Sequence, residues 1–207
     1  MSKINFYNVD CLEFMADVPD NFYDLAICDP PYGIGINHNM GRRKGQKASG
    51  YKKAYWDNEA PPINYFTELF RISKNEIIWG ANYFISRMPF DSSCWLMWDK
   101  LFSEDVSFAQ FELAWTSFNT TCKKYDKSPN QLNRIHPTQK PISLYRWLLQ
   151  KYAKQGDKIL DTHGGSMSIA IACDMEGFDL DICEIDKDYF NAGKQRFFEY
   201  KRQLKLF

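Results

Sequence analysis

The feature that most constrains this chain is a short apolar segment that ends in two prolines. Residues 24–28 read Asp-Leu-Ala-Ile-Cys, and Asp29, Pro30, Pro31 and Tyr32 follow directly. A short apolar run of this kind predicts a buried β-strand. Because proline has no N–H group, the two prolines predict that the ladder of strand hydrogen bonds stops there. We therefore expect a rigid strand end with a carboxylate, free carbonyls and an aromatic ring, the place where open α/β sheets bind ligands.

The composition is that of a folded protein from a reducing compartment. The chain has 207 residues, 44% of them hydrophobic and 16% aromatic, which is enough for the core of one domain. No apolar run has membrane-spanning length and no signal-peptide pattern is present, so we expect a cytoplasmic protein with no membrane partner. The six cysteines and three histidines lack metal-site spacing. We expect reduced thiols that pack in the core, and no bound metal.

The periodicity of apolar residues predicts strands that alternate with helices. Seven strands are expected, at residues 4–8, 24–28, 76–79, 93–98, 111–116, 158–161 and 178–183. Helices are expected at 11–18, 63–72, 81–87, from 141, at 166–175 and after an N-cap at Asp186. The linker at 101–110 is too short for a crossover helix, so its two flanking strands should be antiparallel. The predicted fold class is α/β, with one domain over residues 1–207 and a mostly parallel sheet with one antiparallel strand.

Two segments concentrate basic charge, although the net charge of the chain is zero. Residues 33–62 and 117–135 show no periodicity, so we expect both to be irregular. Between residues 42 and 53 the first segment carries six basic side chains and no acid: Arg42, Arg43, Lys44, Lys47, Lys52 and Lys53. The second segment carries Lys123 and Lys124. Either run alone fits a solvated loop, but two basic loops could supply contacts to nucleic-acid phosphates.

A second predicted strand end carries a glycine turn. Asp161 is followed by Thr, His, Gly165 within a Gly-Gly pair, and Ser166, where helical periodicity begins. Glycine lets the backbone approach a ligand closely, and a helix start attracts an anion. About 20 residues further on, Glu184 ends the next strand, where an acid can bind ribose hydroxyls. These residues fit a nucleotide site or a purely structural turn. The missing G-x-G-x-x-G pattern disfavours a nicotinamide oxidoreductase.

Three separated segments resemble the DNA adenine-N6 and cytosine-N4 methyltransferases that use S-adenosyl-L-methionine. The Asp-Pro-Pro-Tyr segment resembles the catalytic motif of that family, and residues 136–141, His-Pro-Thr-Gln-Lys-Pro, resemble the segment before its cofactor-covering helix. Residues 161–166 and 183–186 resemble its methionine and ribose sites. This motif order is that of the circularly permuted β class, found in small phage and bacterial members. The resemblance implies a Rossmann-like methyltransferase domain that flips adenine out of double-stranded DNA and methylates N6 in a specific sequence, and it allows a homodimer.

The resemblance also assigns roles to individual residues. Asp29 and the Pro30 carbonyl would accept the two N–H groups of the substrate amine, Pro31 would stiffen the segment, and Tyr32 would stack on the flipped base. Asp10 would contact the cofactor adenine, Asp161 the methionine ammonium and Glu184 the ribose. The full expected cofactor set is Asp10, Thr138, Gln139, Lys140, Asp161, His163, Gly165, Ser166 and Glu184. The basic residues named above form the expected DNA-binding set.

Several alternatives remain open at this stage. Met167 stands where the family usually has glycine, so it either crowds the cofactor or begins the following helix one residue sooner. Methylation of cytosine N4, or of an RNA base, would use the same strand end. Asp29 at the first motif position favours adenine by resemblance. A nucleic-acid-binding relative that has lost catalysis is the non-enzymatic alternative.

Overall fold

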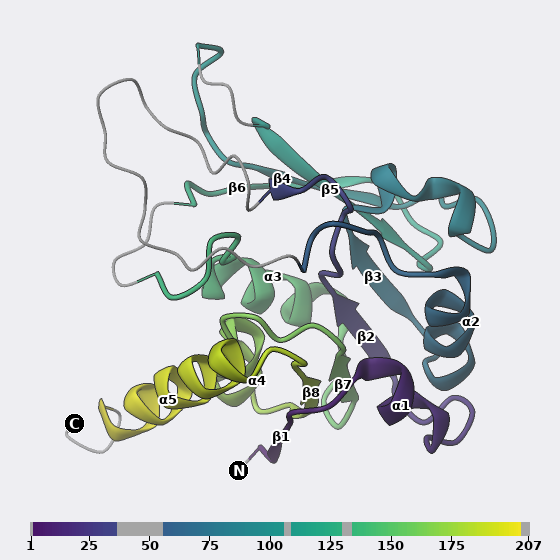
Figure 1. Ribbon diagram of the computed structural model, residues 1–207. Coiled ribbons are helices and arrows are strands. Elements are labelled where there is room, and N and C mark those ends of the chain that lie inside the picture. The colour runs from purple at the N-terminus through teal and green to yellow at the C-terminus, as the bar shows by residue number, and fades with distance from the viewer. Residues whose placement is uncertain (1, 37–55, 106–108, 130–133, 204–207) are drawn as a thin grey trace.

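The computed structural model describes residues 2–36, 56–105, 109–129 and 134–203 (Figure 1). Its strands are β1 Ile4–Tyr7, β2 Leu25–Cys28, β3 Glu76–Trp79, β4 Trp95–Asp99, β5 Phe111–Thr116, β6 Lys123–Asp126, β7 Lys158–Asp161 and β8 Asp179–Cys183. Its α-helices are α1 Cys11–Ala16, α2 Ile63–Ile72, α3 Ile142–Tyr152, α4 Ser168–Glu176 and α5 Lys187–Gln203. Two 3₁₀ turns, η2 Ala81–Tyr83 and η3 Ile85–Arg87, replace the single short helix expected at 81–87. Among the described residues, no helix has the length and apolarity needed to cross a lipid bilayer.

All eight strands form one sheet in the order β1-β8-β7-β2-β3-β5-β4-β6. Only β5 is antiparallel to its neighbours, which confirms the α/β class and the antiparallel pairing expected across the linker at 101–110. The expected count of seven strands was wrong because β6 pairs in parallel with β4 at the edge of the sheet. This strand lies inside the segment 117–135 that we expected to be irregular. Its sequence, Lys-Lys-Tyr-Asp, lacks the apolar alternation by which a strand is recognised.

The strand pairing brings distant parts of the sequence to one edge of the sheet. Strand β2 pairs in parallel with β7, and Leu25 lies opposite Ile159. Strand β7 in turn pairs in parallel with β8, and β8 with β1. Because these four strands run in the same direction, their carboxyl ends meet at the same edge. The segment that follows Cys28 therefore lies beside the segment that follows Asp161.

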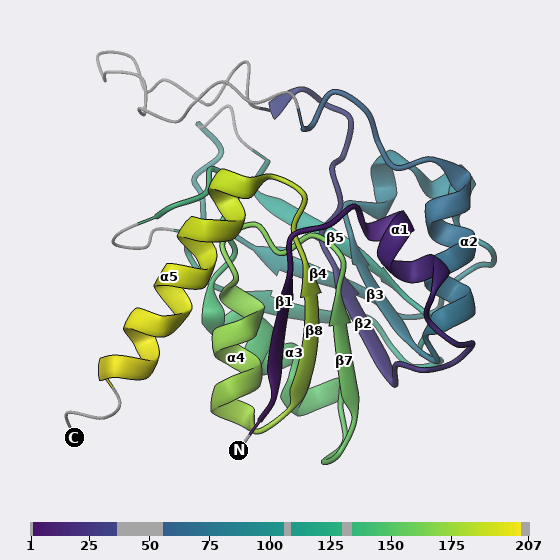
Figure 2. The same cartoon turned by 60° about the horizontal axis from the view of Figure 1, so that its bottom comes forward.

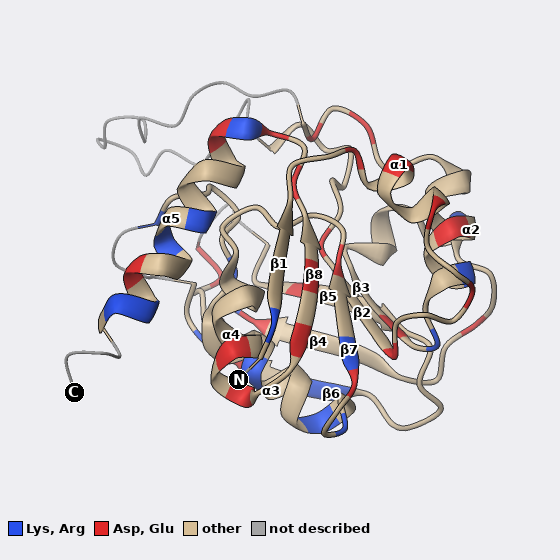
Figure 3. Ribbon diagram, turned by 90° about the horizontal axis from the view of Figure 1, so that it is seen from below, with Lys and Arg blue, Asp and Glu red and all other residues tan. Residues whose placement is uncertain are grey.

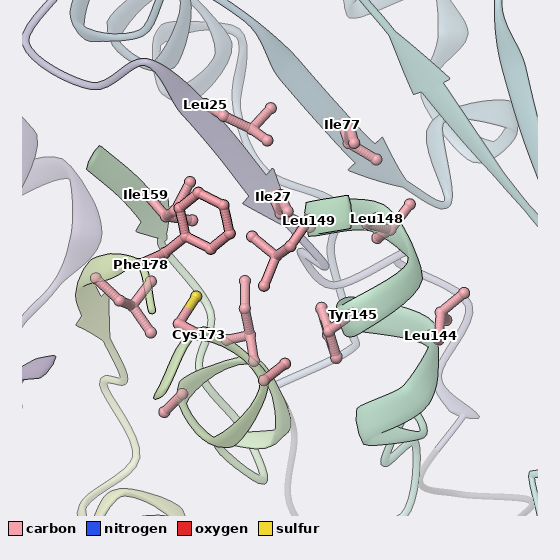
Figure 4. Close-up of a cluster of buried hydrophobic side chains, with 14 of the residues drawn as sticks. Leu25, Ile27, Ile77, Leu144, Tyr145, Leu148, Leu149, Ile159, Cys173 and Phe178 are labelled. Carbon is pink, nitrogen blue, oxygen red and sulfur yellow. The ribbon is translucent and has the colours of Figure 1, made fainter. Parts of the chain in front are cut away.

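Helices cover both faces of the sheet, with α1 and α2 on one side and α3, α4 and α5 on the other (Figure 2). The sheet separates two hydrophobic cores, one under each layer of helices. Successive residues of β2 alternate between these cores, so Leu25 and Ile27 pack toward α3 and α4. Figure 4 shows the core between the sheet and helices α3 and α4, in which Leu148 and Leu149 of α3 approach the strands. Burial on both faces explains why β2 reads as a continuous apolar run.

Four cysteines are buried, as expected for reduced thiols, and three of them, Cys28, Cys94 and Cys173, pack in the two cores. Cys11 is half-buried and Cys122 is exposed, so the expectation of a core position was wrong for Cys122. Asp186 caps α5 as predicted, since its Oδ1 accepts the N–H groups of Asp188 at 2.8 Å and Tyr189 at 3.0 Å.

Met167 does not begin the following helix, which was one of the two alternatives considered for it. It adopts a left-handed backbone conformation, with φ of 56°, at the N-cap of α4. Helix α4 therefore begins at Ser168, later than the expected start, because a left-handed residue cannot continue a right-handed helix. The side chain is fully buried against Gly164 and Gly193. The positive φ explains why glycine suits this position, and the buried side chain explains how methionine is retained there.

Replacing Met167 by glycine separates these two effects. Met167→Gly relieves backbone strain of about 1 kcal/mol but removes a fully buried side chain, so we expect the free energy of unfolding to fall by about 2–4 kcal/mol. Urea denaturation measures this change. Leu101→Gly is the matched control, because Leu101 has the same φ of 56° but is 60% exposed. This control relieves the same backbone strain without loss of a buried side chain, so it should be as stable as the wild type or up to about 1 kcal/mol more stable. A Met167→Gly protein as stable as the wild type would contradict the packing role.

Candidate active site

The carboxyl ends of β1, β2, β7 and β8 open into one cleft of about 240 Å³. Of the residues predicted from the sequence, the cleft is lined by Asp10, Asp29, Pro31, Thr138, Gln139, Lys140, His163, Gly165, Ser166 and Glu184. Three of the predicted residues, Pro30, Tyr32 and Asp161, lie beside the cleft without lining it. The strand end at Asp29 and the glycine turn after Asp161 thus share one cavity, as the sequence predicted.

Asp29 is held from two sides by hydrogen bonds. The ammonium of Lys140 lies 2.5 Å from its Oδ2, and the hydroxyl of Tyr32 donates to its Oδ1 at 2.7 Å. Burial raises the pKa of Asp29, whereas the charge of Lys140 opposes that rise. Burial alone would lower the pKa of Lys140, but Asp29 and Glu112 reverse the effect and raise it. Lys140 was predicted to bind a cofactor; the structure shows that it also pairs with Asp29.

Tyr32 packs tightly against the end of β3. Its ring stacks on Tyr83, with centroids 5.2 Å apart and planes 17° from parallel. The same ring lies directly over Gly80, where an added Cβ would overlap it. Gly80 also has a φ of 73°, which favours glycine. Sequence reasoning gave Gly80 no role, although it sits where β3 meets the segment after β2.

Asp57 binds the backbone of the segment that follows Asp29. Its Oδ1 accepts the N–H groups of Tyr32 at 2.7 Å and Gly33 at 3.0 Å, and its Oδ2 accepts that of Ile36 at 2.8 Å. Asp57 is only 2% exposed. A carboxylate that accepts three backbone N–H groups fixes a turn strongly, because such charge-assisted bonds exceed neutral ones in strength. No local pattern signals this role, since Asp57 follows its three donors by more than 20 residues.

The glycine turn is held by two acidic side chains. Glu184 accepts the N–H of Gly165 at 2.7 Å through Oε2 and the N–H of Asp186 at 2.8 Å through Oε1. Asp161 is 1% exposed and accepts the N–H of His163 at 2.9 Å. Burial raises the pKa of Asp161 to about 8 and also raises the pKa of Glu184. Asp161 therefore holds the turn from a buried position outside the cleft, whereas Glu184 lines the cleft.

Both histidines of the cleft are uncharged at neutral pH. Burial lowers the pKa of His136 to about 3 and that of His163 to about 4. The N–H of Thr138 points to Nδ1 of His136 at 3.3 Å, and the His136 ring meets Tyr189 edge-on at 4.3 Å. Of the described residues that line the cleft, Lys140 is the one cation, against the acids Asp10, Asp29, Glu184 and Asp186. This charge balance favours a ligand that carries positive charge.

Trp56 adds a donor to the cleft that sequence reasoning did not identify. Its ring lies 5.3 Å from that of His136, and it lines the same cavity. Its buried indole N–H has no hydrogen-bond partner among the described residues. Buried donors are normally paired, so the partner of this N–H lies outside the described residues or in a bound ligand.

The predicted DNA-binding residues fall in two different situations. Arg42, Arg43, Lys44, Lys47, Lys52 and Lys53 lie outside the described residues. Lys123 and Lys124 lie on β6, the basic edge strand in Figure 3, so their expected placement in a loop was wrong. Lys124 Nζ lies 3.0 Å from Asp126 and 3.2 Å from Asp99, and these acids offset its charge.

Removing the Asp57 carboxylate should loosen the segment after β2. Asp57→Ala leaves three N–H groups without their acceptor, so we expect the free energy of unfolding to fall by about 2–4 kcal/mol. Urea denaturation is the measurement. Asp126→Ala on the exposed edge strand is the control, expected within about 0.5 kcal/mol of the wild type. Equal stability of Asp57→Ala and the control would contradict the role of Asp57.

Comparisons with known proteins identify relatives of this chain. YubD of Escherichia coli (strain K12) is 25% identical to this chain over 218 residues, covering 96% of this chain and 92% of YubD. The solved structure titled M1.HpyAVI-SAM complex has a TM-score of 0.60 at 19% identity, and covers 93% of this chain and 98% of its own. The cytosine-N4-specific PvuII DNA methyltransferase has a TM-score of 0.66 at 14% identity, over 95% of this chain and 87% of its own. These two structures show the same fold. The N6/N4 DNA methylase family model matches residues 73–195, more than half of the chain, and this chain therefore belongs to that family of DNA methylases.

Proposed function

We propose that this protein transfers a methyl group from S-adenosyl-L-methionine to the exocyclic N6 of adenine in a specific sequence of double-stranded DNA. The observation that carries the proposal is the single cleft shared by Asp29 and the glycine turn. A methyl donor seated on the turn and an amine held by Asp29 would be neighbours there. Membership of the DNA methylase family supports DNA as the substrate. The homodimer allowed by the resemblance stays a prediction.

The residues of the cleft fit S-adenosyl-L-methionine in charge and in hydrogen bonding. When bound, the cofactor supplies an electrophilic methyl group on a positively charged sulfonium. The acidic lining and the two neutral histidines suit that cation. Glu184 lines the cleft and could accept ribose hydroxyls, and the indole N–H of Trp56, which has no partner among the described residues, could donate to a ligand oxygen. The M1.HpyAVI structure, titled as a complex with SAM, shares this fold.

Asp29 and Pro30 would activate the substrate amine by orientation. The lone pair of an exocyclic amine is delocalised into its ring, so the nitrogen becomes nucleophilic only when it is drawn toward tetrahedral geometry. Asp29 can accept one N–H, and the Pro30 carbonyl, held between two rigid residues, can accept the other. The Asp29 carboxylate would also face the nitrogen as it gains positive charge. Tyr32 holds Asp29 through its hydroxyl, and its stacking on the flipped base stays a prediction.

The choice of adenine rests on the aspartate at position 29, which favours adenine by family resemblance. Cytosine N4 is the second candidate, because the structural neighbour with the TM-score of 0.66 is cytosine-N4-specific. Both amines present two N–H groups to the same pair of acceptors, so one assay must read both products.

The decisive assay uses labelled S-adenosyl-L-methionine and unmethylated bacterial DNA, followed by digestion to nucleosides. We expect label in N6-methyladenine with the wild type, and a rate at least about 100-fold lower with Asp29→Ala. Asp20→Ala, an exposed carboxylate in the loop between α1 and β2, is the control and should keep wild-type activity. Label in N4-methylcytosine would overturn the base assignment alone. No label in any nucleoside would overturn the proposed function.

Cofactor affinity tests the assignment of Glu184. Glu184→Ala removes a charge-assisted acceptor at the cleft, so we expect binding of S-adenosyl-L-methionine to weaken by about 1–3 kcal/mol in calorimetry. Glu184→Gln keeps the shape and one carbonyl oxygen, so it should fall between the wild type and Glu184→Ala. Unchanged affinity in both variants would contradict the ribose role.

A further inference from the structure

Asp29 is the end of a chain of buried charges that reaches across the sheet. Lys140 Nζ lies 2.5 Å from Asp29 and 2.9 Å from Glu112, and Glu112 lies 2.7 Å from Lys100 Nζ. Asp29 follows β2, Lys140 precedes α3, Glu112 lies on β5 and Lys100 follows β4. Two carboxylates and two ammonium groups therefore alternate in sign along one path. Neither Glu112 nor Lys100 takes part in the activation of the amine that is proposed above.

Stability alone gives little reason for this arrangement. The side chains of Lys140, Lys100 and Glu112 are 2%, 14% and 18% exposed, so their charges are largely withdrawn from water. Desolvation of such groups offsets most of their mutual attraction, and apolar residues of similar size often stabilise a protein equally well. Glu112 lies opposite Trp98 in the sheet, where an apolar side chain would pack readily. We therefore expect these charges to serve the function of Asp29, to which Lys140 connects them.

Tyr32 links the two carboxylates a second time. Its single hydroxyl proton is within reach of Asp29 Oδ1 at 2.7 Å and of Glu112 Oε2 at 3.2 Å. Lys140 also approaches the Tyr32 hydroxyl oxygen, at 3.3 Å. When a substrate amine donates to Asp29, the Tyr32 hydroxyl can turn its proton to Glu112. Asp29 would then be released without displacement of any side chain and without a carboxylate left unpaired.

We propose that Glu112 is a positioning residue for Asp29, acting through Lys140 and Tyr32 and held in place by Lys100. This inference rests on the proposed methyl transfer to an amine held by Asp29. Glu112 shares the ammonium of Lys140, which leaves Asp29 free to accept an N–H from the substrate. Without the Glu112 charge, Lys140 and Tyr32 would both bind Asp29 alone and hold it away from the amine.

The test compares Glu112→Gln with the wild type in single-turnover methylation of unmethylated bacterial DNA. We expect the rate to fall about 10- to 100-fold, the size of effect produced by misplacement of a reacting group. The dissociation constant for S-adenosyl-L-methionine should stay near the wild-type value. The melting temperature should fall, because the ammonium groups of Lys140 and Lys100 lose a charged partner, so both rates are measured at a temperature at which circular dichroism shows the two proteins fully folded. Glu176→Gln is the matched control, because Glu176 is a carboxylate of similar exposure, 16%, that pairs with Arg146 and lies at the C-terminal end of α4, whereas the cleft lies at the N-terminal end. It should methylate at the wild-type rate.

Lys100 supplies a second, independent pair of variants should Glu112→Gln fold poorly. Lys100→Met leaves Glu112 without its outer partner and should slow methylation in the same way, whereas Lys100→Arg keeps the ion pair and should retain most of the rate. A wild-type rate in Glu112→Gln and Lys100→Met would overturn the positioning role and leave the proposed function intact. Cofactor binding weakened in proportion to the lost rate would indicate a merely structural role. A wild type that methylates neither base would overturn both proposals.

Discussion

The parallel pairing of β2 with β7 is the constraint on which the rest of the structure depends. It places the end of β2, and with it Asp29, next to the turn that follows Asp161, although more than 120 residues separate them in the sequence. Parallel strands end at the same edge of a sheet, so a ligand on the glycine turn and a group held by Asp29 must be neighbours. The permuted order of the motifs does not matter to this geometry, because only the order of the strands decides which ends meet.

A second constraint is the cost of burying charge at that edge. Asp29 cannot be withdrawn from water alone, and Lys140 offsets its charge at 2.5 Å. Lys140 in turn needs more than one carboxylate for its three N–H groups, and Glu112 provides the second. Lys140 and Lys100 outweigh the effect of burial and lower the pKa of Glu112 to about 2, so Glu112 stays charged. The carboxylate of Asp29, which we propose as catalytic, is therefore one member of a balanced group, and its orientation depends on residues from four separate elements.

The sequence was informative where function depends on local chemistry. Two prolines ended β2 at the predicted place, Asp186 capped α5, and the short linker at 101–110 predicted the antiparallel pairing of β4 and β5. It was uninformative where function depends on distant contacts. Asp57 binds three N–H groups more than 20 residues away, and Glu112 meets Lys140 across the sheet. Strand β6 is stabilised by pairing with β4 rather than by its own apolar pattern, so periodicity missed it.

The central claim is that the glycine turn and Asp29 serve one reaction within one cleft. A crystal structure with S-adenosyl-L-homocysteine, the cofactor without its methyl group, tests this claim most directly. We expect the ribose hydroxyls to bind Glu184 and the sulfur to face Asp29 across a gap wide enough for one methyl group and one amine. A sulfur atom turned away from Asp29, or a cofactor bound outside this cleft, would contradict it.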